Sequence, residues 1–189
     1  VYPRGLAFAT RVQVPGFSEI LDGEFRPGHF EGVASVVMRL FSMVQPNVAI
    51  FGDKDYQQLL VIRRMATDLF LPVEIVGSPT VRAPDGLALS SRNVYLSEDE
   101  RAIAPKLYEE LRRVAVAIDT DDESAKDLQA LETEARRNLR AFGFKVEYFT
   151  IRSANTLLTP SLSESELVIL VAARLGRARL IDNTRATRP

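Results

Sequence analysis

Cysteine is absent from this sequence of 189 residues, and His29 is its only histidine. Without cysteine the chain can form neither disulfides nor thiolate metal sites, which suits a reducing compartment, and we expect a cytoplasmic protein. A single histidine nearly excludes metal ligation by histidine, and we assign no metal-ligating residue in the chain.

An excess of one charge is also missing. Lysine and arginine number 24 against 25 aspartate and glutamate, which gives a formal net charge of −1. Nucleic-acid binders usually need a strong basic field, so we expect no nucleic-acid partner. Small neutral or anionic substrates fit this charge balance better.

Long hydrophobic runs and a recognisable start are missing as well. The longest apolar run, Leu167 to Ala173, has the length of a strand and falls far short of the roughly 20 residues that span a membrane. We therefore expect a soluble protein with no membrane partner. Val1, Tyr2 and Pro3 supply neither an initiator methionine nor the basic and apolar regions of a signal peptide, so we expect the chain to be part of a longer one.

The first part of the chain alternates between helical and strand patterns. The expected elements are a helix over 33–44, a strand over 48–51, a helix over 59–69 and a strand over 73–76. Pro72 should close the second helix. A strand–helix–strand unit of this kind is right-handed and its strands are parallel. Residues 1–80 therefore predict part of a doubly wound, Rossmann-like parallel sheet domain of the α/β class.

After about residue 80 the pattern changes. Ser97 and Glu100 resemble a capping box and predict a helix start, while Pro105 must either kink that helix or begin its main segment. The further elements are helical stripes over 107–118 and 128–139, and strands over 144–151, 167–173 and 178–182. The last two strands are close enough around Gly176 to form a hairpin. Residues 81–189 thus predict a smaller α+β domain with a three-stranded antiparallel sheet.

A first polar cluster stands where the strand over 48–51 ends. It consists of Gly52, Asp53, Lys54, Asp55, Gln57 and Gln58. Ligands of open α/β sheets bind outside the carboxyl ends of the strands, and free N–H groups at a helix start favour phosphate or carboxylate. If the helix begins by Lys54, then Lys54 and Gln58 project from one face, where lysine can neutralise phosphate and glutamine can hydrogen-bond a substrate. The alternative is a solvated, acid-rich helix start without a ligand.

A second polar cluster follows the turn residues Asp85 and Gly86. It consists of Ser90, Ser91, Arg92 and Asn93. Two hydroxyls and a guanidinium can meet a polyphosphate with several donors at once and stabilise charge that develops during phosphoryl or nucleotidyl transfer. The alternative is a polar loop whose serines cap a helix.

Common catalytic motifs are not found. The sequence has no Gly-x-x-x-x-Gly-Lys-Ser loop, no Gly-x-Gly-x-x-Gly and no serine nucleophile with a histidine base in a recognisable frame. We therefore expect no covalent catalysis by the usual routes. His29 precedes a helix, where it either touches a ligand or has a structural role.

Three ordered segments together resemble the pantothenate synthetase family. They are Arg26-Pro-Gly-His-Phe-Glu-Gly-Val33, Phe51-Gly-Asp-Lys-Asp-Tyr-Gln-Gln58 and Asp85-Gly-Leu-Ala-Leu-Ser-Ser-Arg-Asn93. Leu175, Gly176 and residues 179–183 are similar to the C-terminal strand pair of that family, so the resemblance runs essentially from end to end. Asp53 stands where the family usually has glutamate, a conservative departure.

The resemblance implies a ligase that forms a carbon–nitrogen bond in two half-reactions. Pantoate attacks the α-phosphate of ATP to give pantoyl adenylate and pyrophosphate, and β-alanine then displaces AMP. The residues implied to bind ATP are Gly52, Asp53, Lys54, Asp55, Val81, Leu89, Ser90, Ser91 and Arg92. Among these, Lys54 and the mobile Ser90-Ser91-Arg92 loop are implied to be catalytic, and Gln58 to hold pantoate. Mg²⁺ is implied to be carried mainly by the phosphates of ATP.

One family motif has no counterpart here. The family's His-x-Gly-His sequence cannot occur in a chain whose only histidine is His29. The resemblance therefore implies the C-terminal two-thirds of such an enzyme, inactive alone, from a family that forms homodimers. The alternatives are another adenylyl-transferring enzyme of the same superfamily and a non-catalytic nucleotide-binding module.

Overall fold

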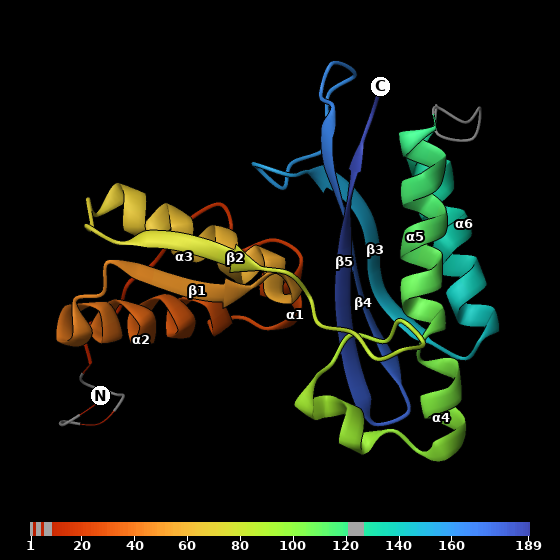
Figure 1. Cartoon of the computed structure of the whole chain (residues 1–189), viewed down its shortest axis with the longest axis horizontal. Helices are drawn as coiled ribbons and strands as arrows, with labels where there is room; N and C mark the ends of the chain where they lie inside the picture. Colours follow the sequence, from red (N-terminus) through yellow and green to blue (C-terminus); the bar gives the residue numbers. More distant parts are fainter. Residues whose placement is uncertain (1, 3–4, 6–8, 121–126) are drawn as a thin grey trace. The chain divides into compact units, whose positions relative to one another are not determined.

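The computed structural model describes residues 2, 5, 9–120 and 127–189. The chain divides into two compact units, Val1–Pro79 and Thr80–Pro189, and Figure 1 shows the elements of each. Within the described ranges no helix combines the length and the apolar character needed to cross a membrane.

The first unit contains a parallel pair of strands joined by a helix. Its elements are α1 (Asp22–Phe25), α2 (His29–Val44), β1 (Val48–Gly52), the 3₁₀ turn η1 (Asp53–Asp55), α3 (Tyr56–Asp68) and β2 (Glu74–Ser78). Val48 lies opposite Glu74 and Gly52 lies opposite Ser78 in the parallel ladder. The predicted strand–helix–strand unit is therefore confirmed.

Helix α3 ends earlier than the sequence suggested. Its last residue is Asp68, and the chain turns at Phe70, whose φ of 51° lies in the left-handed region. The prediction that Pro72 closes this helix is wrong, because the turn at Phe70 ends it first.

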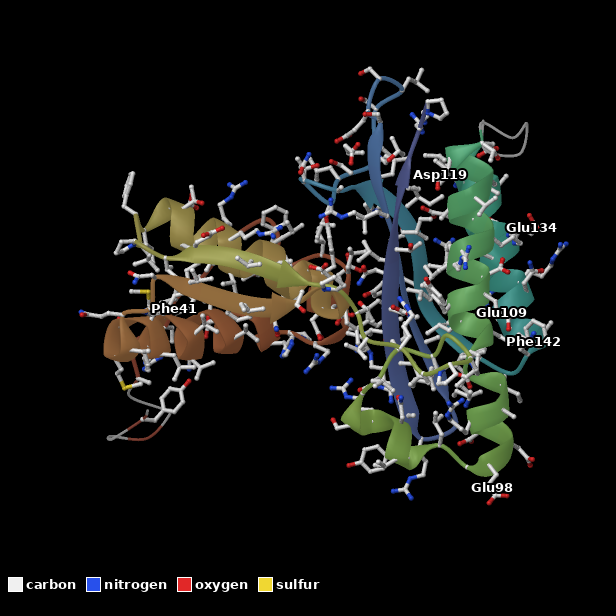
Figure 2. All side chains as sticks on the ribbon, in the orientation of Figure 1. Phe41, Glu98, Glu109, Asp119, Glu134 and Phe142 are labelled. Atoms are coloured by element: carbon white, nitrogen blue, oxygen red, sulfur yellow. The ribbon has the colours of Figure 1, made fainter. Side chains whose placement is uncertain are left out.

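Helices α2 and α3 bury their apolar stripes in this unit. Phe30, Ala34, Val37 and Phe41 of α2 are buried at helical spacing, and Figure 2 labels Phe41. The Phe41 ring meets that of Phe51 of β1 edge-on, with ring centroids 6.4 Å apart. Successive side chains of β1 point to opposite faces of the strand, so alternate ones point away from these helices. Val48 and Ile50, which alternate with Phe51, are exposed.

The second unit is an antiparallel sheet covered by helices. Its elements are η2 (Ser91–Tyr95), α4 (Glu98–Ile103), α5 (Lys106–Asp119), α6 (Leu128–Ala141), β3 (Lys145–Ser153), β4 (Glu166–Leu175) and β5 (Ala178–Thr187). Strand β4 is central and pairs with both neighbours in antiparallel fashion. Alternate residues of the strands pack with the apolar stripes of α5 and α6 in one core. The predicted fold class, a parallel α/β part followed by an α+β part with three antiparallel strands, is confirmed.

Two predicted helix starts and one predicted turn of this unit are confirmed. Ser97 and Glu100 form the capping box of α4 with both reciprocal hydrogen bonds, and Pro105 is the N-cap of α5, so it begins the main helical segment. Gly176, with φ of 53°, lies in the β4–β5 hairpin. Strand β5 runs to Thr187, further than predicted, and the Thr187 N–H donates to Asp119 at the end of α5 (Figure 2).

Candidate functional site

The first predicted cluster lies at the carboxyl edge of the parallel strands. Gly52 is the last residue of β1 and pairs with Ser78, the last residue of β2. Asp53, Lys54 and Asp55 follow as one 3₁₀ turn before α3. The edge where parallel strands end and a helix starts is the usual ligand position of open α/β sheets.

The assumed helix start at Lys54 is wrong. Lys54 lies in the 3₁₀ turn, and α3 begins only at Tyr56, after Asp55 with φ of −95° and ψ of 57°. Lys54 and Gln58 are therefore not one turn apart on a continuous α-helix, and the argument that they share a helix face does not hold. Both side chains are half-buried, and Lys54 has interaction partners within the chain.

The two glutamines of this cluster have different surroundings. Gln57 is buried, and its Nε2 donates to the carbonyl oxygens of Phe17 at 2.6 Å and Ile20 at 2.8 Å. Its Oε1 accepts the N–H of Asp22 at 3.2 Å. Gln57 thus holds the loop before α2, whereas the side-chain amide of Gln58 has no hydrogen-bond partner among the described residues.

Gly77 is a residue of this edge that sequence reasoning missed. A β-carbon placed on Gly77 would overlap the carboxylate of Asp53 and come within 3.2 Å of Leu59 Cδ2. Asp53 therefore lies against the backbone of β2 because residue 77 lacks a side chain. No local pattern indicates this contact, since in the sequence Gly77 only marks the end of a strand.

The second predicted set of ligand-binding residues consists of Val81, Leu89, Ser90, Ser91 and Arg92. It begins on a short hairpin over residues 81–89. Leu89 N–H donates to the carbonyl oxygen of Val81 and Ala83 N–H to that of Leu87, each at 2.9 Å. Arg82 and Ala88 lie opposite each other as an antiparallel β-bridge. This pairing places the predicted ATP-binding residues Val81 and Leu89 next to each other. Their side chains are 67% and 53% exposed, so the hairpin presents an apolar pair to solvent.

The serines and arginine follow at the start of η2. Ser90 Oγ accepts the N–H of Arg92 at 3.2 Å, so the capping alternative describes Ser90 correctly. Within the described ranges, Ser91 Oγ and the Arg92 guanidinium form no hydrogen bond or ion pair. Asn93 Nδ2 donates to Ala88 O at 3.1 Å, which ties η2 to the hairpin, and its buried Oδ1 accepts no hydrogen bond from the part of the chain that the structure describes.

The turn of the hairpin contains Asp85, a carboxylate with a lowered pKa. Arg101 Nη1 lies 2.5 Å from Asp85 Oδ2, and Leu87 N–H donates to Asp85 Oδ1 at 3.2 Å. The hydrogen bond from Arg101, assisted by that from Leu87, lowers the pKa of Asp85 below its usual value. The turn is therefore stabilised by an ionised Asp85.

The two predicted sets belong to different units of the chain, the first to Val1–Pro79 and the second to Thr80–Pro189. Among the residues that the structure describes, no three His, Cys, Asp or Glu side chains gather as a metal site. A cavity of about 380 Å³ in the first unit is lined by Met38, Phe41, Ser42, Gln45, Pro46, Asn47, Leu71, Pro72 and Val73. It contains none of the predicted site residues.

Comparison with known proteins gives a consistent result. Residues 1–185 match the model of the pantoate-beta-alanine ligase family. The pantothenate synthetase of Pseudomonas savastanoi pv. phaseolicola is 53% identical over 188 residues, which are 100% of this chain and 65% of that protein. That of one Pseudomonas fluorescens strain is 56% identical over 183 residues, 97% of this chain and 63% of that protein. The chain thus spans just under two thirds of the length of these curated relatives.

Solved structures give the same match. The pantothenate synthetase of Thermus thermophilus has a TM-score of 0.89 and 50% identity, with 100% of this chain and 66% of that chain covered. A pantoate-beta-alanine ligase of Francisella tularensis, described as complexed with beta-gamma ATP and beta-alanine, has a TM-score of 0.71 and 33% identity. That match covers 97% of this chain and 60% of the Francisella chain.

Proposed function

The chain belongs to the pantoate-beta-alanine ligase family, and on this premise we propose that its protein joins pantoate to β-alanine with the use of ATP. The observation that carries the proposal is the family match over residues 1–185, which includes both predicted ligand sets. The Francisella relative described with beta-gamma ATP and beta-alanine supports the choice of substrates.

The reaction that we propose has two steps. A carboxylate oxygen of pantoate attacks the α-phosphorus of ATP, the bond from that phosphorus to the bridging oxygen breaks, and pyrophosphate leaves. The amine of β-alanine then attacks the acyl carbon of pantoyl adenylate, loses a proton and expels AMP. The carbon–nitrogen bond formed is the amide of pantothenate.

The chain's own residues have distinct tasks in this proposal. Lys54 donates to the phosphates from the carboxyl edge of β1 and β2, and Gln58 hydrogen-bonds pantoate with the amide that has no partner within the described residues. The other ATP contacts come from Gly52, Asp53, Asp55, Val81, Leu89, Ser90, Ser91 and Arg92. The Arg92 guanidinium, which has no partner within the described ranges, is suited to a phosphate oxygen pair.

Magnesium would enter with ATP and neutralise phosphate charge there. In this proposal Mg²⁺ stays on the nucleotide, without a separate protein site. The proposal also includes a Rossmann-like sheet in the first unit and a mobile lid role for the second unit. It further includes a homodimer and a cytoplasmic location.

The 189 residues alone are expected to be inactive. The His-x-Gly-His sequence that the family resemblance implies is absent from them, because His29 is their only histidine. A segment that carries this motif has to complete the ATP site. The isolated chain, mixed with ATP and pantoate, should therefore release no pyrophosphate.

The proposal is tested by pyrophosphate release from the full-length protein with ATP and pantoate, before β-alanine is added. Release that requires pantoate, followed by AMP and pantothenate once β-alanine is present, is the expected result. Release with other carboxylic acids but not with pantoate would point to a different adenylyl-transferring enzyme, and no release to a non-catalytic module.

Lys54→Ala sharpens this test. Because a lysine on the phosphates acts on charge that develops in the transition state, its loss should slow adenylation about a hundredfold. Pantoate binding should change far less. Lys145→Ala, at an exposed lysine of β3, is the matched control and should leave the rate unchanged. Rapid-quench measurement of adenylate formation in both variants tests this, and an unchanged rate in Lys54→Ala would show that Lys54 does not act on the phosphates.

A further inference from the structure

Arg82 is the most tightly held charged side chain of the hairpin. Its guanidinium forms a bidentate pair with Asp182 of β5, with Nη1 2.6 Å from Oδ2 and Nη2 3.0 Å from Oδ1. The Asp182 side chain is 2% exposed and that of Arg82 is 18% exposed. The ion pair is therefore shielded from water, where removing one partner leaves an uncompensated buried charge.

Two further contacts fix the plane of this guanidinium. Its carbon atom lies 3.4 Å from the centroid of the Tyr108 ring of α5, as in a stacked cation–π pair. Nη1 also donates to the carbonyl oxygen of Gly86 at 3.1 Å, inside the turn of the hairpin. Arg82 thus joins the hairpin turn to both the sheet and α5.

The hairpin also contacts the rest of this unit through apolar side chains, since Leu87 belongs to the hydrophobic core and Ala83 packs against it. Its strands pair with each other, Asp85 of its turn binds Arg101 near the surface, and Asn93 binds it from η2. Arg82 joins the hairpin to β5 through hydrogen bonds to the Asp182 carboxylate and the carbonyl oxygen of Asn183. Leu87 thus holds the turn end of the hairpin by apolar packing, and Arg82 adds directional polar contacts next to Val81.

We propose that Arg82, held by Asp182 and Tyr108, is a positioning residue that fixes the Val81–Leu89 pair for the base of the nucleotide. The inference rests on the proposed function. An exposed apolar pair suits the flat face of a heteroaromatic base and offers nothing to a phosphate. Arg82 itself is occupied by protein partners and does not touch the ligand in this proposal.

The conservative change Arg82→Lys is informative here. Lysine keeps the positive charge but has neither the planar fork that binds Asp182 in bidentate fashion nor the flat face that stacks on Tyr108. The hairpin should then lose its fixed position while the charge balance is kept. The binding of ligands that carry the base should be weakened most.

The test compares ligands with and without a base in the full-length protein. For Arg82→Lys we expect the KM for ATP and the inhibition constant of AMP to rise about tenfold, because small displacements of a binding group have effects of this order or larger. The inhibition constant of pyrophosphate and the KM for pantoate should stay within about twofold. Arg174→Lys, the same change at an exposed ion pair with Glu147, is the control and should alter none of these.

The outcomes separate the two proposals. If the unaltered protein shows no pyrophosphate release that depends on ATP and pantoate, the proposed function fails. If it is active but Arg82→Lys weakens the binding of AMP and of pyrophosphate equally, or changes the binding of neither, the positioning role is wrong and Arg82 merely stabilises the fold. If Arg82→Lys does not fold, Tyr108→Leu keeps the ion pair and removes the stacking; a selective weakening of AMP supports the role, and its absence overturns it.

Discussion

Gln57 and Gln58 are adjacent at the start of α3, but the buried Gln57 amide forms three hydrogen bonds to backbone and the amide of Gln58 has no partner among the described residues. The carbonyl oxygens of Phe17 and Ile20 accept from Nε2 of Gln57, and the N–H of Asp22 donates to its Oε1. One glutamine therefore serves the fold, and the other is available to a ligand.

The role of Gln57 predicts a large loss of stability for Gln57→Leu. The substitution keeps much of the volume but leaves three backbone groups, two of them buried, without their partner, at about 3 kcal/mol in the free energy of unfolding. Urea denaturation of Gln57→Leu measures this loss. Gln129→Leu, at an exposed glutamine of α6, is the control and should stay within about 0.5 kcal/mol of the unaltered protein. Equal stability of the two variants would contradict the structural role of Gln57.

The main elements could be predicted because their hydrophobic periods are strong. The parallel strands β1 and β2 around α3, the capping box at Ser97 and the hairpin at Gly176 each follow from a local pattern of apolar spacing or turn residues. These patterns depend on residues close in sequence. The structure therefore agrees with the sequence on them, apart from a few residues at the ends.

The details of the candidate site depend on contacts that no local pattern reports. Sequence spacing treated Gln57 and Gln58 alike, because the loop that Gln57 binds lies 35 to 40 residues away. The 3₁₀ turn at Asp53–Asp55 displaced the expected helix start, and the pairing of Arg82 with Asp182 joins residues 100 positions apart. Long-range packing decides such features, so only the structure reveals them.

The contact between Asp53 and Gly77 predicts the effect of Gly77→Ala. The new β-carbon would overlap the Asp53 carboxylate and crowd Leu59, so Asp53 has to move away from β2. If Asp53 binds ATP, we expect the KM for ATP of the full-length protein to rise about tenfold. Gly32→Ala is the control, because a β-carbon there meets no atom within 4 Å, and its KM should not change. An unchanged KM for Gly77→Ala would show that the position of Asp53 is unimportant for ATP.

The lowered pKa of Asp85 predicts a pH dependence at the hairpin turn. Since the folded pKa lies below the unfolded value of about 3.9, the stabilisation by this carboxylate is present above that value and is lost as the pH falls through the folded pKa. Arg101→Gln removes the largest cause, so the pKa of Asp85 should rise toward the ordinary value. Carbon-detected NMR titration of the Asp85 carboxyl measures both midpoints. Identical midpoints would show that Arg101 does not hold the ionised form.

The last prediction concerns Gln58 and separates substrate recognition from ATP binding. Gln58→Leu keeps much of the bulk but removes both polar atoms of the amide, so the buried polar groups of bound pantoate lose a partner, at about 1 to 3 kcal/mol. Pantoate should bind about 5 to 150 times more weakly by the usual conversion of free energy to affinity. ATP affinity should change little, because the contacts proposed for the phosphates come from Lys54 and the second unit.

Titration calorimetry of the full-length protein with each ligand separately tests this, with Gln129→Leu as the matched glutamine control. A selective loss of pantoate affinity in Gln58→Leu would assign the free amide to the substrate. Equal losses for pantoate and ATP would instead indicate damage to the start of α3, of the kind expected for Gln57→Leu. Unchanged pantoate affinity would show that the half-buried amide of Gln58, which has no partner among the described residues, does not bind pantoate.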